Sequence, residues 1–99
     1  MKNNWYSQYE CLKKDLEHLV LKRFTTFIDL KNKVNEYTNF YKLEVKDFGF
    51  KSDYDNDFED FVVAISIGND KQVLYDLDVY FAITRIGERI ITEIGIEEV

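Results

Sequence analysis

The chain has 99 residues with 13 Lys and Arg against 19 Asp and Glu, so its formal net charge is −6, divided into +3 over residues 1–51 and −9 over residues 52–99. Its 45% apolar and 16% aromatic content excludes a disordered chain, and its length allows one domain, residues 1–99, around one core. The acidic balance argues against direct nucleic-acid binding, because neutralising phosphate requires a concentrated basic face.

The first part of the chain predicts two amphipathic helices within residues 1–37, with one long bent helix as the alternative. Ser7 with Glu10, and Thr26 with Asp29, have the spacing of a capping box, in which each side chain bonds the free backbone N–H of the other residue. A largely apolar stripe recurs at every third or fourth position and consists of Trp5, Tyr9, Leu12, Leu16, Leu19, Val20, Arg23 and Phe27.

Residues 40–99 alternate between apolar and polar side chains, which predicts a four-stranded antiparallel meander. The first strand starts at Phe40. Because Phe48 and Phe50 fall on the opposite parity from Val45, a bulge or sharp bend is predicted near 47–49. The other three strands are predicted at 61–67, 73–84 and 89–97.

The predicted turns set the register of the last three strands. A three-residue loop after residue 68 pairs Ile65 with Tyr75. Gly87 occupies the first central position of a two-residue type II′ turn, where positive φ is required, and this turn pairs Phe81 with Ile94. Apolar side chains then lie opposite one another, so the register is self-consistent.

These elements predict an α+β fold. An N-terminal amphipathic helix, or two, packs on one face of the four-stranded antiparallel meander, because both the helical stripe and the apolar sheet face need a partner. The layer pattern resembles that of cystatin-like and nuclear-transport-factor-like folds, and this analogy concerns the layers alone.

The segment 53–60 is predicted to be an acidic loop between the first two strands. Its alternating aspartates copy the start of an EF-hand loop, but the positions that need glycine and a bidentate glutamate hold Phe58 and Ala64. A solvated loop is one interpretation, and a partner-binding loop is the other, favoured by the two aromatic residues. The candidate binding residues are Asp53, Tyr54, Asp55, Asp57, Phe58, Glu59 and Asp60.

The outward side chains of the last two predicted strands form a second candidate surface, made of Asp76, Asp78, Tyr80, Glu93 and Glu97. The predicted register places Asp78 opposite Glu97 and Tyr80 opposite Gly95. One interpretation is a solvated face whose acids discourage edge pairing. The other is an acidic docking surface with an aromatic centre, which would attract a basic partner.

Catalytic equipment is not predicted. His18 and Cys11 are the sole histidine and cysteine, and seven residues on a helix separate them by roughly 10 Å, too far for a hydrogen bond. No glycine-rich phosphate loop or Cys-x-x-Cys motif occurs, so no enzyme activity, cofactor or metal is expected. A single cysteine and the lack of an apolar run long enough for a membrane span predict a soluble cytoplasmic protein.

We therefore expect a small acidic protein that neutralises a basic partner. The first hypothesis is an immunity protein or antitoxin that inhibits a nuclease-type toxin by occluding its active site. The first alternative is a phage or mobile-element DNA mimic that inhibits a restriction or CRISPR effector. A small-ligand-binding protein or enzyme of the nuclear-transport-factor-like type is the second alternative, disfavoured because Tyr75 and Thr92 are the only polar side chains expected on the inner sheet face. The chain is expected to be bacterial, and a monomer or a weak homodimer.

Overall fold

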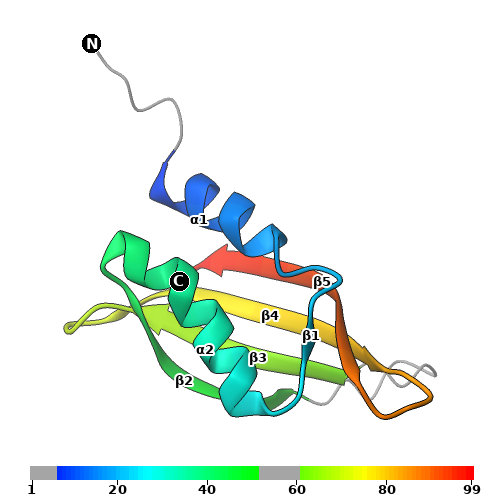
Figure 1. The fold of residues 1–99 in the computed structure, drawn as a ribbon. Coiled ribbons are helices and arrows are strands. Elements are labelled where there is room, and N and C mark those ends of the chain that lie inside the picture. Colours follow the sequence, from blue (N-terminus) through cyan, green and yellow to red (C-terminus); the bar gives the residue numbers. More distant parts are fainter. Residues whose placement is uncertain (1–6, 52–60) are drawn as a thin grey trace.

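The computed structural model describes residues 7–51 and 61–99 (Figure 1). Its helical elements are α1 (Gln8–Glu17), α2 (Phe27–Thr38) and the short 3₁₀ helix η1 (Asn39–Tyr41). Its strands are β1 (Arg23–Phe24), β2 (Glu44–Lys51), β3 (Phe61–Gly68), β4 (Val73–Ile83) and β5 (Arg89–Glu98). They form one antiparallel sheet in the order β1-β5-β4-β3-β2. The α+β class is confirmed, whereas the prediction of four strands is wrong because β1 adds a fifth.

Both helices begin at the predicted caps. Ser7 Oγ accepts a hydrogen bond from the Glu10 N–H at 3.2 Å, and Thr26 Oγ1 accepts one from the Asp29 N–H at 3.0 Å. Asp29 in turn accepts from the Thr25 N–H at 3.1 Å, and this bond holds the pKa of Asp29 below its ordinary value. The two-helix prediction is therefore confirmed, and the single bent helix is wrong.

Replacing Thr26 by alanine is expected to lower the free energy of unfolding by about 1 kcal/mol, because the N–H of Asp29 loses its acceptor. Urea denaturation of the wild type, Thr26→Ala and Thr26→Ser measures the effect. The serine variant keeps the accepting hydroxyl and serves as the control. A serine variant as unstable as the alanine variant would show that the cap is not responsible.

The segment between the helices differs from the predicted continuation of the apolar stripe. Helix α1 ends at Glu17, and Leu21 takes a left-handed conformation with φ 73°. The backbone of Leu21 and Lys22 then bonds Ile91, which starts the pairing of β1 with β5. Leu19 and Phe24 are each 2% exposed, so this part of the stripe is buried by a turn and a two-residue strand rather than by helix.

Strand β2 begins at Glu44, four residues later than predicted, because η1 and Lys42, with φ 61°, occupy the preceding positions. The register of β2 on β3 shifts between Val45 and Asp47, so Lys46 is the extra residue of a β-bulge. The predicted irregularity is thus confirmed, one residue earlier than expected, and it turns Phe48 toward the core.

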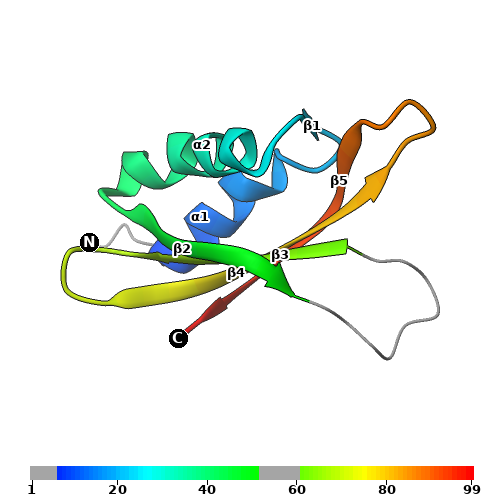
Figure 2. The ribbon, with the colours of Figure 1, turned by 90° about the horizontal axis from the view of Figure 1, so that it is seen from below.

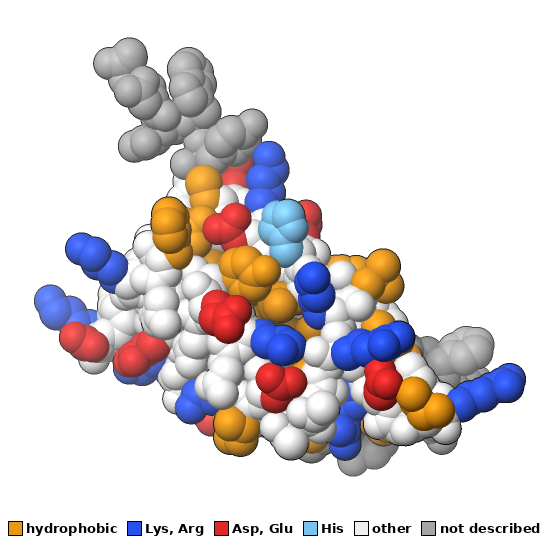
Figure 3. All heavy atoms as spheres, viewed as in Figure 1, with side chains coloured by type: hydrophobic (Ala, Val, Ile, Leu, Met, Phe, Trp, Pro, Cys, Tyr) orange, Lys and Arg blue, Asp and Glu red, His pale blue; other side chains and the backbone are white. Residues whose placement is uncertain are grey.

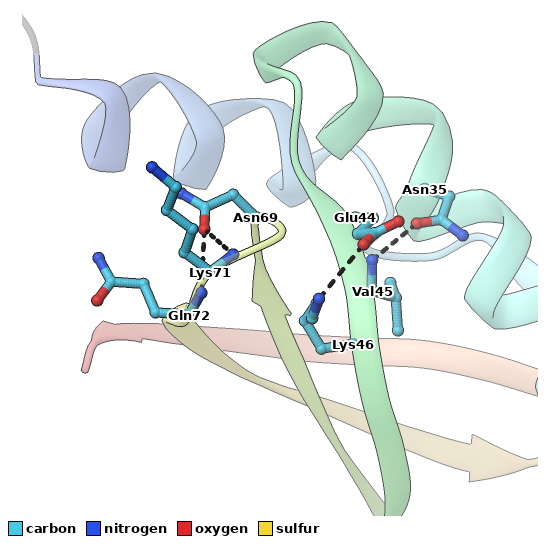
Figure 4. A network of polar contacts seen from close by, with 7 residues as sticks. All are labelled: Asn35, Glu44, Val45, Lys46, Asn69, Lys71 and Gln72. Carbon is cyan, nitrogen blue, oxygen red and sulfur yellow. Dashed lines mark hydrogen bonds and ion pairs between the residues drawn. The ribbon is translucent and has the colours of Figure 1, made fainter.

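The loop between β3 and β4 is longer than predicted. The Asn69 N–H donates to the Gln72 carbonyl, and Asn69 Oδ1 accepts from the N–H groups of Lys71 and Gln72 (Figure 4). Tyr75 consequently lies opposite Ile67 rather than Ile65, so the predicted register is wrong by two residues. Because the error is even, every side chain still faces its predicted side.

The turn between β4 and β5 also differs from the prediction. The Thr84 N–H donates to the Glu88 carbonyl and the Gly87 N–H to the Thr84 carbonyl, which closes a three-residue loop. Gly87 supplies a φ of 85° at the last position of that loop, so the predicted two-residue type II′ turn is wrong. A second bulge leaves Thr92 exposed and buries Ile91 completely, which corrects the inward placement of Thr92.

The turn shifts the β4–β5 register by three residues, and the bulge reduces the shift to two in the part of the ladder beyond it. Phe81 lies opposite Ile91 rather than Ile94, and Val79 now pairs with Ile94. Both helices cover the same face of the sheet (Figure 2). The core lies between these layers, and its fully buried residues are Leu12, Leu16, Val34, Ile67, Leu77, Val79 and Ile91.

Candidate functional site

The sheet face that points away from both helices is called the outer face here. It is formed by the alternate residues of β2 to β5 that do not enter the core. Its positions in the register include Asp47, Gly49, Lys51, Val62, Ala64, Ser66, Asp76, Asp78, Tyr80, Ala82, Ile90, Glu93, Gly95 and Glu97.

The register arranges most of the outer face in three rows across the strands, with neighbours about 5 Å apart in a row and rows about 6.8 Å apart. The first row is acidic: Asp47, Ser66, Asp76 and Glu97. The middle row has small residues around one acid: Gly49, Ala64, Asp78 and Gly95. The third row holds the positions of Lys51, Val62, Tyr80 and Glu93. Five carboxylates therefore occupy one surface.

Asp76 and Glu97 are direct cross-strand neighbours, and both are exposed. Like charges in this position destabilise a sheet. Within residues 7–51 and 61–99, no ion pair joins Asp76, Glu93 or Glu97 to a basic side chain. The negative charge of this part of the outer face is therefore not compensated by the described chain.

The double-mutant cycle of Asp76→Asn and Glu97→Gln tests this repulsion. Each single variant is expected to raise the free energy of unfolding by about 0.2–1 kcal/mol, because it removes one of two opposed charges. The double variant should gain little more, so its gain in urea denaturation at low salt should be smaller than the sum of the two single gains. Simple additivity of the two changes would contradict a direct interaction.

Tyr80 lies at the centre of the third row, half-buried between Val62 and Glu93. Val62 is only 3% exposed although it belongs to the outer face. An aromatic ring supported by a buried neighbour keeps few rotamers, which lowers the entropy lost when a partner packs on it. The outer face thus combines a half-buried aromatic side chain with surrounding carboxylates.

The structure brings together the five sheet residues predicted for a site but corrects how they pair. Asp78 lies opposite Gly95 rather than Glu97, and Tyr80 lies opposite Glu93 rather than Gly95. Asp47 belongs to the same face and was not predicted, although the parity of the phenylalanines that follow it signalled the bulge. The predicted loop residues lie outside the described part of the chain: Asp53, Tyr54, Asp55, Asp57, Phe58, Glu59 and Asp60.

A second polar arrangement lies between the helices, away from the outer face. The Tyr41 hydroxyl donates to Asp15 Oδ2 at 2.5 Å and links η1 to α1. Burial, reinforced by the hydrogen bond and the negative charge of Asp15, raises the pKa of Tyr41 to about 12. The folded state therefore holds this proton more tightly than the unfolded state, whose ordinary tyrosine pKa is 10.0.

This difference predicts alkaline lability. The contribution of Tyr41 is fully present below pH 10 and is lost as the pH rises from about 10 to about 12, because only the unfolded chain ionises readily there. Urea denaturation across this range should show a steeper loss of stability for the wild type than for Tyr41→Phe. Parallel pH curves for the two proteins would contradict the assignment.

The described residues offer no other evident chemistry. Among them, no three His, Cys, Asp or Glu side chains are placed to hold a metal ion, and no helix is long and apolar enough to cross a membrane. His18 is exposed at the C-terminal cap of α1, and Cys11 is half-buried on the same helix. Comparison with known proteins gives no match to a family model, to a curated protein or to a solved structure.

Proposed function

We propose that this chain is a non-catalytic binding protein that neutralises a basic partner, and that the partner is a nuclease-type toxin to which it confers immunity. The observation that carries the proposal is the acidic outer face. Strands β2, β4 and β5 place five carboxylates on a sheet face that neither helix covers, and Asp76 lies directly opposite Glu97. Opposed carboxylates lower the stability of the free protein, and a partner that supplies cations would remove this repulsion on binding. Such a cost in stability is common at functional surfaces.

Occlusion is the proposed mechanism. A nuclease holds the phosphates of its substrate with Lys and Arg side chains, and a row of carboxylates offers them the same kind of charged acceptor. Asp47, Asp76 and Glu97 form such a row across the sheet. Their mutual spacing is set by strand pairing rather than by flexible loops, so the partner meets a pre-organised surface and less entropy is lost on binding.

The middle row provides room for cationic side chains. A Cβ added at Gly49 or Gly95 would meet no atom within 4 Å, so the backbone is open there. A guanidinium group can approach the sheet closely beside Asp78, between the acidic row and the row of Tyr80. Tyr80 then serves as the anchor that packs against the partner, and the surrounding acids raise the association rate.

A small-ligand function of the nuclear-transport-factor-like type receives no support from the core. Thr38 and Tyr75 are buried side chains with a hydroxyl, and both hydroxyls are already bonded within the chain: Thr38 donates to the Asn35 carbonyl and Tyr75 to Gln8 Oε1. The inner sheet face is filled by aliphatic and aromatic side chains. A polar ligand would therefore find no internal partner among the described residues.

The test is co-purification with the product of the neighbouring gene, followed by titration of that protein's nuclease activity. One-to-one inhibition by the wild type supports the proposal. Asp76→Lys/Glu93→Lys should abolish it, whereas Glu17→Lys/Asp70→Lys, which makes the same charge change off the outer face, should not. Asp55→Lys/Asp57→Lys tests the acidic loop in the same assay. Equal inhibition by all variants, or none by the wild type, would refute the proposal.

A further inference from the structure

A groove of about 520 Å³ opens between α1, the end of α2 and η1, on the face opposite the outer face. Its apolar lining comes from Cys11, Tyr37, Phe40 and Tyr41. The rings of Phe40 and Tyr41 pack edge-to-face, with 5.2 Å between their centroids. The hydrogen bond from the Tyr41 hydroxyl to Asp15 holds the Tyr41 ring in place. The two rings at the groove are therefore held by contacts within the chain.

Phe40 is the least buried large apolar side chain of the described chain, with 81% of its surface exposed. It lies at the wall of the groove, so an apolar projection and an apolar hollow are adjacent on one surface. Such an arrangement suits an isologous contact, in which a two-fold rotation would bring the projection of each copy onto the hollow of the other.

The charges at the groove are self-complementary as well. Lys14 lies on the α1 side and Glu36 on the α2 side, and both are exposed. A two-fold axis between the helices would exchange these sides and would place Lys14 of each copy near Glu36 of the other. Across the whole helical region, residues 7–43 carry seven Lys and Arg against five Asp and Glu, and both signs are interleaved on this face (Figure 3).

We infer that this groove and Phe40 form the interface of a symmetric homodimer, with a second copy of the same chain as the occupant. Two chains of charge −6 repel each other least through their helical faces, since the acids of the sheet lie on the opposite side. The dimer buries both Phe40 side chains and leaves two outer faces exposed. Any partner of the outer face would then meet a bivalent protein.

Sedimentation equilibrium from micromolar to millimolar protein tests the inference. The wild type is expected to show a monomer–dimer equilibrium. Phe40→Asp should weaken it by roughly thirtyfold or more, as for the central residue of an interface. Ile86→Asp is the matched control, because Ile86 is 80% exposed, lies on the β4–β5 hairpin and receives the same charge. Its dimerisation should equal that of the wild type.

The charge pair gives a test that does not depend on apolar surface. Glu36→Lys should weaken the dimer, because it places two lysines together at each end of the groove. Adding Lys14→Glu to that variant should restore dimerisation, since the exchanged pair is again complementary. Failure of the second change to restore it would show that Lys14 and Glu36 do not meet across the axis.

Alkylation of Cys11 provides an independent readout of the same surface. This thiol is half-buried in the groove and is the sole cysteine, so its reaction with iodoacetamide should slow as wild-type protein concentration rises. Phe40→Asp should react at a rate that does not depend on concentration. A wild type that remains monomeric at millimolar concentration, or a Phe40→Asp variant that dimerises as well as Ile86→Asp, would overturn the inference.

Discussion

Truncating Leu77 to alanine is expected to lower the free energy of unfolding by about 2–5 kcal/mol. Leu77 is fully buried on the central strand β4 and lies opposite Ile65 and Ile96, so no neighbour can collapse into the cavity without moving the sheet. A loss of this size is a large fraction of the roughly 5–15 kcal/mol that stabilises a typical small domain. Urea and thermal denaturation of the purified variant measure it.

Two variants control for the chemistry of that change. Leu21→Ala removes the same atoms from a side chain that is 75% exposed and should change the stability by less than about 0.5 kcal/mol. Leu77→Met conserves the volume and should lose less than about 1.5 kcal/mol. If Leu77→Ala were no more harmful than Leu21→Ala, the helices would not pack on β4 as described.

The faces of the sheet could be predicted from the sequence because alternation has a period of two. Tyr75, Leu77 and Val79 face the core as expected, although two loops are longer than predicted. The β3–β4 loop shifted its register by two residues, and an even shift leaves every side chain on its own side. The β4–β5 turn shifted its register by three, which turned Ile91 inward and Thr92 outward until the bulge restored the predicted sides from Glu93 onward. The β4 residues of the outer face and its β5 residues from Glu93 onward were therefore predictable, whereas Asp47 and the cross-strand partners were not.

The exact neighbours depend on backbone features that leave little trace in the sequence. Thr84 pairs with Glu88 because Gly87 adopts positive φ at the end of a three-residue loop, whereas the same glycine also suits a two-residue turn. The extra residue at Thr92 then sets which acid lies opposite Asp76. Turn type and bulge position are decided by packing of the whole sheet, so local pattern alone does not determine them.

Strand β1 and the groove could not be predicted for a different reason. Strand β1 has only two residues, Arg23 and Phe24, so it cannot show an alternation of apolar and polar side chains. Its pairing partners lie more than sixty positions away in the sequence. The groove arises where α1, α2 and η1 meet, and η1 occupies residues expected to be strand. Both features result from tertiary contacts between segments whose separate patterns carry no sign of the contact.

Asp76→Lys is expected to separate folding from binding. In the free protein the new lysine lies directly opposite Glu97, so a repulsive pair becomes an attractive one and the free energy of unfolding should rise by about 0.2–1 kcal/mol. Toward a basic partner the same change places a cation in the middle of the acidic row, and the association rate constant at low salt should fall about tenfold or more. Stopped-flow association and urea denaturation of one preparation measure both effects.

Glu17→Lys, an equal charge change on α1, should leave the association rate close to that of the wild type. An Asp76→Lys variant that is less stable than the wild type would contradict the repulsion between Asp76 and Glu97. A variant that associates as fast as the Glu17→Lys control would contradict the outer face as the binding surface.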